Sequence, residues 1–393
     1  MRKNSSQGLI IFGLISFILF TANYTQYQLS PLAPQLMDLM QIDAAAFTSA
    51  FTAPMIPAIF FSLISGLLVD RYGARPILGL AVTLMALGTV VRLFSDQYAV
   101  FFFAMFLSGF GPAFLNANAA KLFGAYYPLT RAHRVLGISF AFGCLGMTVG
   151  MGTTALLPSI RAAYLIAAGL SLLAVPAWWG LVEKAPMVKD SSDLSLTDGL
   201  KAVMAHRGIW ATALALFFIM GGALLVNATM PTALAARGLS AVAAGGYSSM
   251  ITIGAIVGSF MTPYIANWLK SLRRAIIVIV AVGILALALA LAWQLPTGLP
   301  LTAGLFLCGF TTSGVLPLLL AIPLSLQGIG VRLAGTAGGF IATFELLGAV
   351  VIPSHVILPL AGDHLTTAFI GASLCMVLTV VAIFFLPTLK TNP

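Results

Sequence analysis

The sequence predicts an all-α membrane protein of twelve transmembrane helices in two pseudo-symmetric six-helix bundles. Hydrophobic residues make up 60% of the chain and charged residues only 7%, whereas a soluble domain carries about 25% charge. The apolar stretches are continuous runs rather than alternating ten-residue segments, which excludes a transmembrane barrel. At about 33 residues per helix and loop, 393 residues allow roughly twelve spans.

Each apolar stretch is long enough to cross about 30 Å of hydrocarbon as a helix, since one residue rises about 1.5 Å. The twelve stretches are Leu9–Leu29, Phe47–Val69, Pro76–Phe94, Tyr98–Phe123, Val135–Leu157, Ala162–Val182, Ile209–Met230, Gly245–Leu269, Ala275–Trp293, Leu299–Leu326, Ala334–Leu360 and Thr366–Leu386. The first stretch, after Met1-Arg2-Lys3, also resembles a signal peptide. Eleven further spans favour a retained helix.

The basic residues predict the orientation. With the N-terminus inside, only Arg92, Arg161 and Arg237 of the 19 Lys and Arg residues fall on the outer side. Cytoplasmic loops carry the excess of Lys and Arg in membrane proteins, so both termini are expected in the cytoplasm. This charge pattern accounts for the net charge of +9 without nucleic acid as a partner. We expect a multi-pass protein of the plasma or inner membrane.

A charged segment divides the chain into two halves of six spans. The segment from Glu183 to Arg207 follows span six and holds eight of the chain's charged residues. The predicted organisation is therefore an N-terminal bundle (1–182), a cytoplasmic linker (183–208) and a C-terminal bundle (209–393). Within the linker, Ser195 and Asp198 precede an amphipathic stretch. This pattern fits a capped helix on the membrane surface, and a flexible linker fits it equally well.

The two halves resemble each other at an offset near 200 residues. The matching pieces are Ser30-Pro31 with Met230-Pro231, Leu107-Ser-Gly-Phe110 with Leu307-Cys-Gly-Phe310, and Arg134-Val-Leu-Gly137 with Arg332-Leu-Ala-Gly335. They occur in the same order, as a six-span duplication requires. Two parallel halves with a substrate site between them near mid-membrane are a transporter architecture.

The loop between spans two and three carries a specific motif. It reads Gly66-Leu-Leu-Val-Asp70-Arg71-Tyr-Gly73-Ala-Arg75 and resembles the signature loop of the major facilitator superfamily, Gly-x-x-x-Asp-Arg-x-Gly-x-Arg, at every fixed position. The resemblance implies that Asp70, Arg71 and Arg75 latch the two halves in one state of an alternating-access cycle. Gly66 and Gly73 suit close helix approach and a tight turn. The other reading is a solvated loop that satisfies the positive-inside rule.

Span five contains Gly137-x8-Gly146-x3-Gly150-Met151-Gly152, which resembles the family's antiporter signature. Met151 stands where that signature has proline, so we interpret the glycines as a helix-packing stripe.

The resemblance implies that spans one, four, seven and ten line a central cavity. Their polar residues are therefore substrate-binding candidates: Asn23, Tyr27, Asn116, Asn227, Thr311 and Thr312. Each could instead bond a neighbouring helix. Gln26 and Gln28 are expected to be wet at the outer interface, where Arg92 is expected to extend its side chain to water.

Glu345 is the acidic residue well inside a span, near the middle of span eleven. A carboxylate there is costly, and ionisable residues inside the membrane are functional hypotheses by default. Glu345 is therefore a candidate for proton coupling or for binding a cationic group. A neutral acid that locks two helices together is the structural alternative.

These features predict a secondary transporter rather than an enzyme, with proton symport as a candidate mechanism. We expect no catalytic residues, no cofactor, no metal site and no phosphate-binding loop, and a monomer with a small-molecule substrate, the lipid bilayer and H⁺ as partners. No Lys or Arg occupies the middle of a span, which favours a neutral, zwitterionic or cationic organic solute. Multidrug or metabolite efflux is the alternative, followed by transport of an organic anion.

Overall fold

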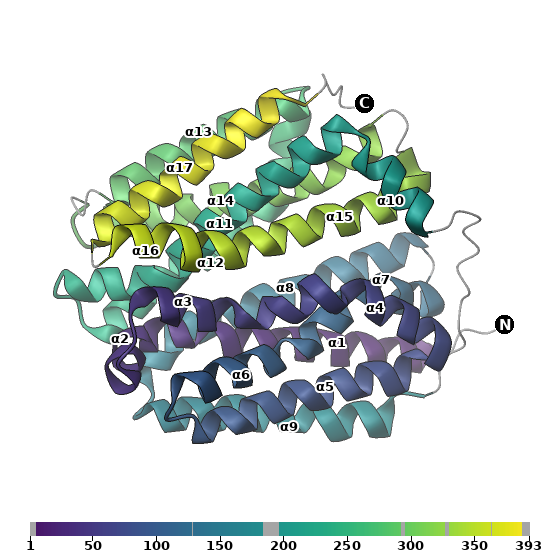
Figure 1. Cartoon of the computed structure of the whole chain (residues 1–393), viewed down its shortest axis with the longest axis horizontal. Helices are drawn as coiled ribbons and strands as arrows, with labels where there is room; N and C mark the ends of the chain where they lie inside the picture. The colour runs from purple at the N-terminus through teal and green to yellow at the C-terminus, as the bar shows by residue number, and fades with distance from the viewer. Residues whose placement is uncertain are drawn as a thin grey trace. The chain divides into compact units, whose positions relative to one another are not determined.

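The computed structural model describes residues 5–127, 129–183, 196–291, 295–326, 330–362 and 364–386. The contacts divide the chain into two compact units, Met1–Ser191 and Ser192–Pro393, coloured purple to blue and teal to yellow in Figure 1. All regular elements in the described ranges are helical. Eleven helices or helix pairs there are long and apolar enough to cross a membrane, which confirms the predicted fold class.

In the first unit, most of the six spans consist of more than one helical piece. The pieces, grouped by span, are α1 (Ser5–Tyr27) and α2 (Leu29–Met40); α3 (Ala44–Thr52), the 3₁₀ turn η1 (Ala53–Met55) and α4 (Ile56–Tyr72); α5 (Ala74–Val91) with the 3₁₀ turn η2 (Arg92–Phe94); α6 (Tyr98–Ser108) and α7 (Phe110–Tyr126); α8 (Leu129–Thr153) with the 3₁₀ turn η3 (Thr154–Leu156); and α9 (Ile160–Leu181). Figure 1 shows α5 beside α9, in agreement with their contacts.

Prolines account for three of these breaks. Pro31, Pro54 and Pro112 lie at or just after the interruptions of spans one, two and four. Proline has no N–H to donate to the carbonyl four residues earlier, and its ring crowds that carbonyl. The first unit therefore bends where its sequence removes backbone donors.

The second unit contains longer uninterrupted helices. They are α11 (Arg207–Ala236), α12 (Ala241–Trp268), α13 (Leu272–Leu291), α14 (Leu299–Ser325), α15 (Gly330–Val351) and α17 (Leu365–Phe384). Span eleven continues past α15 as a π-helical segment, η4 (Ile352–Ile357), and the short α16 (Leu358–Ala361). The predicted ninth span corresponds to α13, which ends at the edge of the described residues.

A short amphipathic helix, α10 (Leu196–Met204), precedes span seven. It packs against α15, and its Val203 side chain is fully buried. The indole Nε1 of Trp210 in α11 donates to the Met204 carbonyl oxygen at 2.8 Å. The helical alternative for this stretch is thus correct over these residues, whereas Ser195 lies outside the described residues.

Glycines bring equivalent helices together in both units. In the first, Gly146 of α8 lies against the Phe20 carbonyl of α1. In the second, Gly348 of α15 lies against the Phe217 carbonyl of α11. A Cβ at either glycine would overlap that carbonyl, so only glycine permits the approach. The predicted packing stripe of span five is therefore a contact with span one, although Gly137 itself is exposed.

The predicted repeat is also visible between spans two and four. Gly109 lies against the Pro54 carbonyl in the first unit, and Gly309 lies against the Ile251 carbonyl in the second. The two glycines occupy the same place in the Leu107–Phe110 and Leu307–Phe310 pieces.

Candidate functional site

The span-one candidates lie within the first unit's helix packing. Tyr27 is buried at 3% exposure, and its ring packs against Phe51 at an interplanar angle of 73° and a centroid distance of 5.4 Å. The Asn23 amide donates from Nδ2 to the Leu19 carbonyl at 2.9 Å. The same amide fills the notch at Gly143 of α8, where a Cβ would approach it to 3.0 Å. Asn23 therefore contributes to the contact between α1 and α8.

Span four carries two asparagines with different surroundings. Asn116, the predicted substrate contact, is exposed. Asn118 is buried and donates from Nδ2 to Ser65 Oγ at 3.0 Å and to the Phe114 carbonyl at 2.9 Å. The sequence analysis did not identify Asn118, which forms the hydrogen bond between span four and span two. Its position between the buried Leu115 and Leu122, at helical spacing, is the signal that could have identified it.

The span-ten threonines bond within their own helix. Thr311 Oγ1 donates to the Leu307 carbonyl and Thr312 Oγ1 to the Cys308 carbonyl, both at 2.8 Å. Thr311 also packs against Gly283 of α13. Their hydroxyls are thus satisfied by backbone carbonyls, as is common for threonine inside helices.

The two remaining candidates of the second unit, Asn227 and Glu345, lie at different positions along the packed helices α11 and α15. Contacts of Phe217 with Gly348 and of Gly221 with Ile352 set the register between α11 and α15. In that register, Glu345 is level with residue 214 of α11, whereas Asn227 is thirteen residues further along. At about 1.5 Å per residue this is roughly 20 Å. The fold therefore does not bring Asn227 and Glu345 together.

Glu345 is partly buried in the middle of α15. Phe344 and Phe340 of the same helix pack edge-on against Trp210, at centroid distances of 5.3 and 5.1 Å. Within the described residues, Glu345 makes no hydrogen bond or ion pair. An acidic group with this surrounding can take up a proton or meet a cation, because no fixed partner in the described chain competes for it.

The signature loop ends α4 and begins α5. Gly73 adopts φ +93°, a conformation that favours glycine, and so permits the turn between the two helices. The Arg71 guanidinium is exposed and lies 5.3 Å from the ring centroid of Tyr72. A Cβ at Gly66 would meet no described atom within 4 Å, so packing inside this unit does not require glycine there. The Asp70 side chain lies outside the described residues.

Arg75 anchors the loop to the end of span six. Its Nη2 donates to the Trp179 carbonyl at 2.5 Å, and the Trp178 indole donates back to the Arg75 carbonyl at 3.0 Å. A cation suits the C-terminal end of a helix such as α9. This contact gives Arg75 a definite structural partner.

The second unit repeats this arrangement without the motif. Arg273 Nη2 donates to the Phe384 carbonyl of α17 at 3.0 Å, and its guanidinium lies 5.2 Å from the centroid of the Phe384 ring. Lys270, in the turn before α13, adopts φ +51°, a positive value like that of Gly73. The turn and the basic anchor therefore occur in both units.

The expectation of wet outer residues is wrong for three side chains. Gln26 is buried and donates from Nε2 to the Phe51 carbonyl at 2.9 Å. Gln28 and Arg92 are buried at 0% and 1% exposure. Helix packing within the first unit covers them, so Arg92 does not extend to water.

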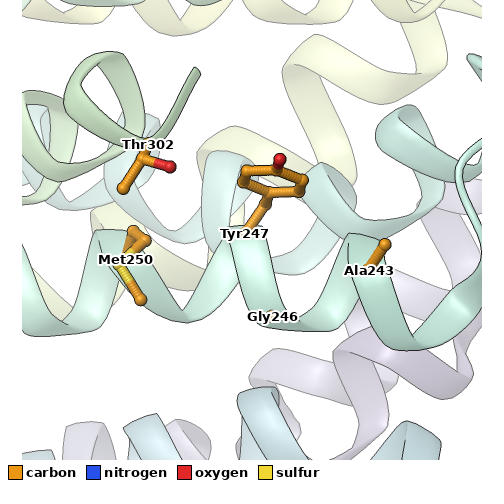
Figure 2. A pocket seen from close by; sticks show the side chains of 5 residues that line it. All are labelled: Ala243, Gly246, Tyr247, Met250 and Thr302. Carbon is orange, nitrogen blue, oxygen red and sulfur yellow. The ribbon is translucent and has the colours of Figure 1, made fainter. Parts of the chain in front are cut away.

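A shallow cavity of about 310 Å³ opens in the second unit, near the first turns of α12 and α14. Figure 2 shows its lining residues: Ala243, Gly246, Tyr247, Met250 and Thr302. The Tyr247 hydroxyl accepts a hydrogen bond from the Gly298 N–H at 2.8 Å. The lining carries no charge and none of the predicted site residues. In the described part of the chain, no three His, Cys, Asp or Glu side chains form a metal-binding group.

Comparisons with curated proteins find transporters. The chain is 30% identical over 133 residues to a probable chloroplast anion transporter of Arabidopsis thaliana, which is 33% of this chain but only 26% of that protein. It is 25% identical to the cyanate transport protein CynX of Escherichia coli K12, over 79% of this chain and 84% of that protein. It is 27% identical to a gallate transporter of Pseudomonas putida, over 84% and 82%.

Solved structures share the fold. A bacterial homologue of the human lysosomal transporter Spinster superposes with a TM-score of 0.75 at 14% identity, covering 96% of this chain and 95% of that one. The nucleoside transporter NupG superposes with a TM-score of 0.74 at 16% identity, covering 96% and 98%.

The sequence model of the Major Facilitator Superfamily matches residues 12–353, which include the signature loop and reach into span eleven. The chain is a multi-pass integral membrane protein and a transporter rather than an enzyme. Together with the helical architecture, this match establishes that the chain belongs to the major facilitator superfamily.

Proposed function

We propose that the protein is a secondary active transporter that moves a small organic solute across the plasma or inner membrane by alternating access. Both termini lie in the cytoplasm in this proposal. The observation that carries it is the family match over residues 12–353, in a chain that divides into two compact units. The charge distribution supports the orientation, because only three of the 19 basic residues fall on the outer side.

The first candidate substrate class is a neutral, zwitterionic or cationic solute with proton coupling through Glu345. A partly buried carboxylate in the middle of a span, without a partner in the described chain, supports this class. Tyr27, Asn116, Asn227, Thr311 and Thr312 remain candidates for substrate contact, together with Asn23. Among them, exposed Asn116 has the side chain most available to a ligand.

The second candidate class is a small organic acid. The relatives include proteins named as transporters of cyanate, gallate, 4-hydroxybenzoate and hexuronate, and these compounds are anions at neutral pH. The names favour an anionic substrate for this chain as well. A proton taken up by Glu345 would then offset the substrate's charge in symport.

Asp70, Arg71 and Arg75 form the gating loop in this proposal. Arg75 supports the assignment by holding the start of α5 to the end of α9, so the loop is tied by a hydrogen bond to span six. Their charges would weigh on the balance between conformations rather than on substrate recognition.

The test begins with thermal-shift screening of the purified protein against neutral, cationic and anionic metabolites, because a bound ligand raises the melting temperature by mass action. The ligand that binds is then used in proteoliposomes that carry Glu345→Gln. Loss of pH-driven accumulation with intact counterflow is expected if Glu345 carries the coupling proton, because glutamine keeps the shape but cannot cycle a proton.

Weakened binding of a cationic ligand would instead assign Glu345 to substrate recognition. Wild-type pH-driven uptake by Glu345→Gln would remove the coupling role. Leu346→Ala, at the adjacent and likewise partly buried position, is the matched control for changes in helix packing.

A further inference from the structure

Arg92 is enclosed in the outer part of the first unit, at the end of α5. Its Nη1 donates to the Thr25 carbonyl of α1 at 2.9 Å. The Gln28 amide, in the orientation that satisfies both its polar atoms, accepts from Arg92 Nη2 and donates to the Ala163 carbonyl of α9 at 3.2 Å. The guanidinium lies 4.4 Å from the ring centroid of Tyr164. Three helices therefore meet around one buried cation.

No anionic partner within the described residues compensates this charge. Each group in contact with Arg92 is a carbonyl, an amide, an aromatic ring or, in Met105, a thioether sulfur. Among the described residues, no carboxylate forms an ion pair with Arg92. Arginine stays protonated in proteins, and a buried charge without a counter-charge is strongly destabilising.

The polar atoms that remain around Arg92 can all donate hydrogen bonds: one is an N–H group and the others are hydroxyls. Arg92 Nε, Thr25 Oγ1 and the Tyr164 hydroxyl are all buried, and none has a hydrogen-bond partner in the described chain. The Thr25 carbonyl and the Gln28 amide oxygen already accept hydrogen bonds from the guanidinium. Thr21 and Ser171, further along α1 and α9, add two more buried hydroxyls without partners.

We propose that this cluster binds a monovalent halide ion, chloride in a physiological medium. A halide accepts hydrogen bonds and donates none, so it matches the remaining N–H and O–H groups. It also supplies the negative charge that a bound water molecule cannot. Because Arg92 is 1% exposed, a monatomic ion suits the enclosed site better than a carboxylate with its attached carbon chain.

The ion would tie the break in span one to spans three and six. Thr25 and Gln28 flank the junction of α1 and α2, Arg92 ends span three, and Tyr164 lies in span six. Chloride is then a structural ligand of the outer part of the first unit. The ion site consists of Arg92 and its neighbours and involves neither the substrate nor Glu345.

The experiment measures thermal unfolding of the full-length protein in detergent, with sodium chloride replaced by sodium gluconate at constant ionic strength. Chloride and bromide should raise the melting temperature by a few degrees in a saturable manner, since they bind the folded state only, and gluconate should not. Equal melting temperatures in chloride and gluconate would overturn the proposal. A rise with formate or acetate but not with halides would overturn it in favour of a carboxylate site.

Variants locate the effect. Tyr164→Phe and Thr25→Val each remove one donor from a nearly unchanged side chain and should raise the half-saturating chloride concentration roughly tenfold. Arg92→Met should abolish the chloride response. Arg237→Met is the control, because Arg237 donates to the Leu295 carbonyl at 3.0 Å in the second unit and should leave the response intact.

If Arg92→Met does not fold, Tyr164→Phe and Thr25→Val still test whether chloride binds at this cluster. An unchanged half-saturating concentration in both would refute binding at this cluster. Loss of transport without loss of the chloride response would bear on the proposed function alone.

Discussion

Spans one, two and four of the first unit are each divided by a short break, whereas the corresponding spans seven, eight and ten are single helices of 30, 28 and 27 residues. The difference follows from a few backbone donors. Pro54 contributes the carbonyl that meets Gly109, and Ile251 contributes the one that meets Gly309. The glycine contact is thus the same in both units, whereas the residue opposite the glycine is a proline only in the first.

The same holds in span four. Pro112 follows Gly109 by three residues, where Thr312 follows Gly309, and only the threonine keeps its N–H. Proline alone is not sufficient, because Pro231 lies inside α11 without interrupting it. The two units thus share one architecture, in which spans one, two and four are interrupted and spans seven, eight and ten are continuous.

Substitutions at Gly109 and Gly309 are expected to have the largest effect on stability. Gly309→Val should destabilise the protein by about 3 kcal/mol and Gly109→Val by about 1 kcal/mol, because overpacking is relieved more easily beside a break than between two continuous helices. Thermal unfolding in detergent measures both. Gly169→Val is the control, since a Cβ there would meet no atom of the described residues within 4 Å. Equal losses for the two variants would mean that the breaks give no such relief.

Arg75 and Arg273 make equivalent contacts, and substituting each one tests whether the two arginines also have equivalent functions. Arg75→Ala and Arg273→Ala each lose a hydrogen bond to the last turn of the unit's sixth span, so both should cost up to about 1 kcal/mol of stability. Only Arg75→Ala, like Asp70→Asn, should strongly lower transport. Uptake into proteoliposomes, normalised to inserted protein, measures this. Equal transport by the two arginine variants would reduce the signature loop to a solvated turn.

The asparagines of span four separate packing from binding. Asn118→Ala should lower stability by about 1–2 kcal/mol, because it removes two hydrogen bonds and leaves the buried Ser65 hydroxyl with one partner fewer. Asn116→Ala should leave the melting temperature unchanged and weaken substrate binding. A destabilised Asn116→Ala variant with normal binding would reverse the two assignments.

Pro54→Ile makes the first unit resemble the second and should have the smallest effect. It restores a backbone donor opposite Gly109 and is expected to change stability by under about 1 kcal/mol while slowing transport modestly. Comparing the maximal uptake rate with the half-saturating substrate concentration checks this. A changed half-saturating concentration with an unchanged rate would indicate that the break shapes the substrate site instead.

Sequence reasoning identified the spans because apolar length alone specifies a membrane helix. It could not foresee the burial of Arg92, since extension to water depends on which helices surround the side chain. The helix phase of span four distinguishes buried Asn118 from exposed Asn116, whereas apolar length does not. The separation of Asn227 from Glu345 needs the register between α11 and α15, which glycine contacts set and hydropathy does not record.

The uninterrupted helices of the second unit have a consequence for the lipid around them. A 30-residue helix such as α11 is about 45 Å long, against about 30 Å of hydrocarbon. Such a rod either tilts or projects into the headgroups, and a thinner bilayer increases the mismatch. A jointed span can bend at its break instead. Bilayer thickness should therefore change the helix tilt in the second unit more than in the first. Lipids with longer or shorter acyl chains should accordingly affect the two halves to different extents.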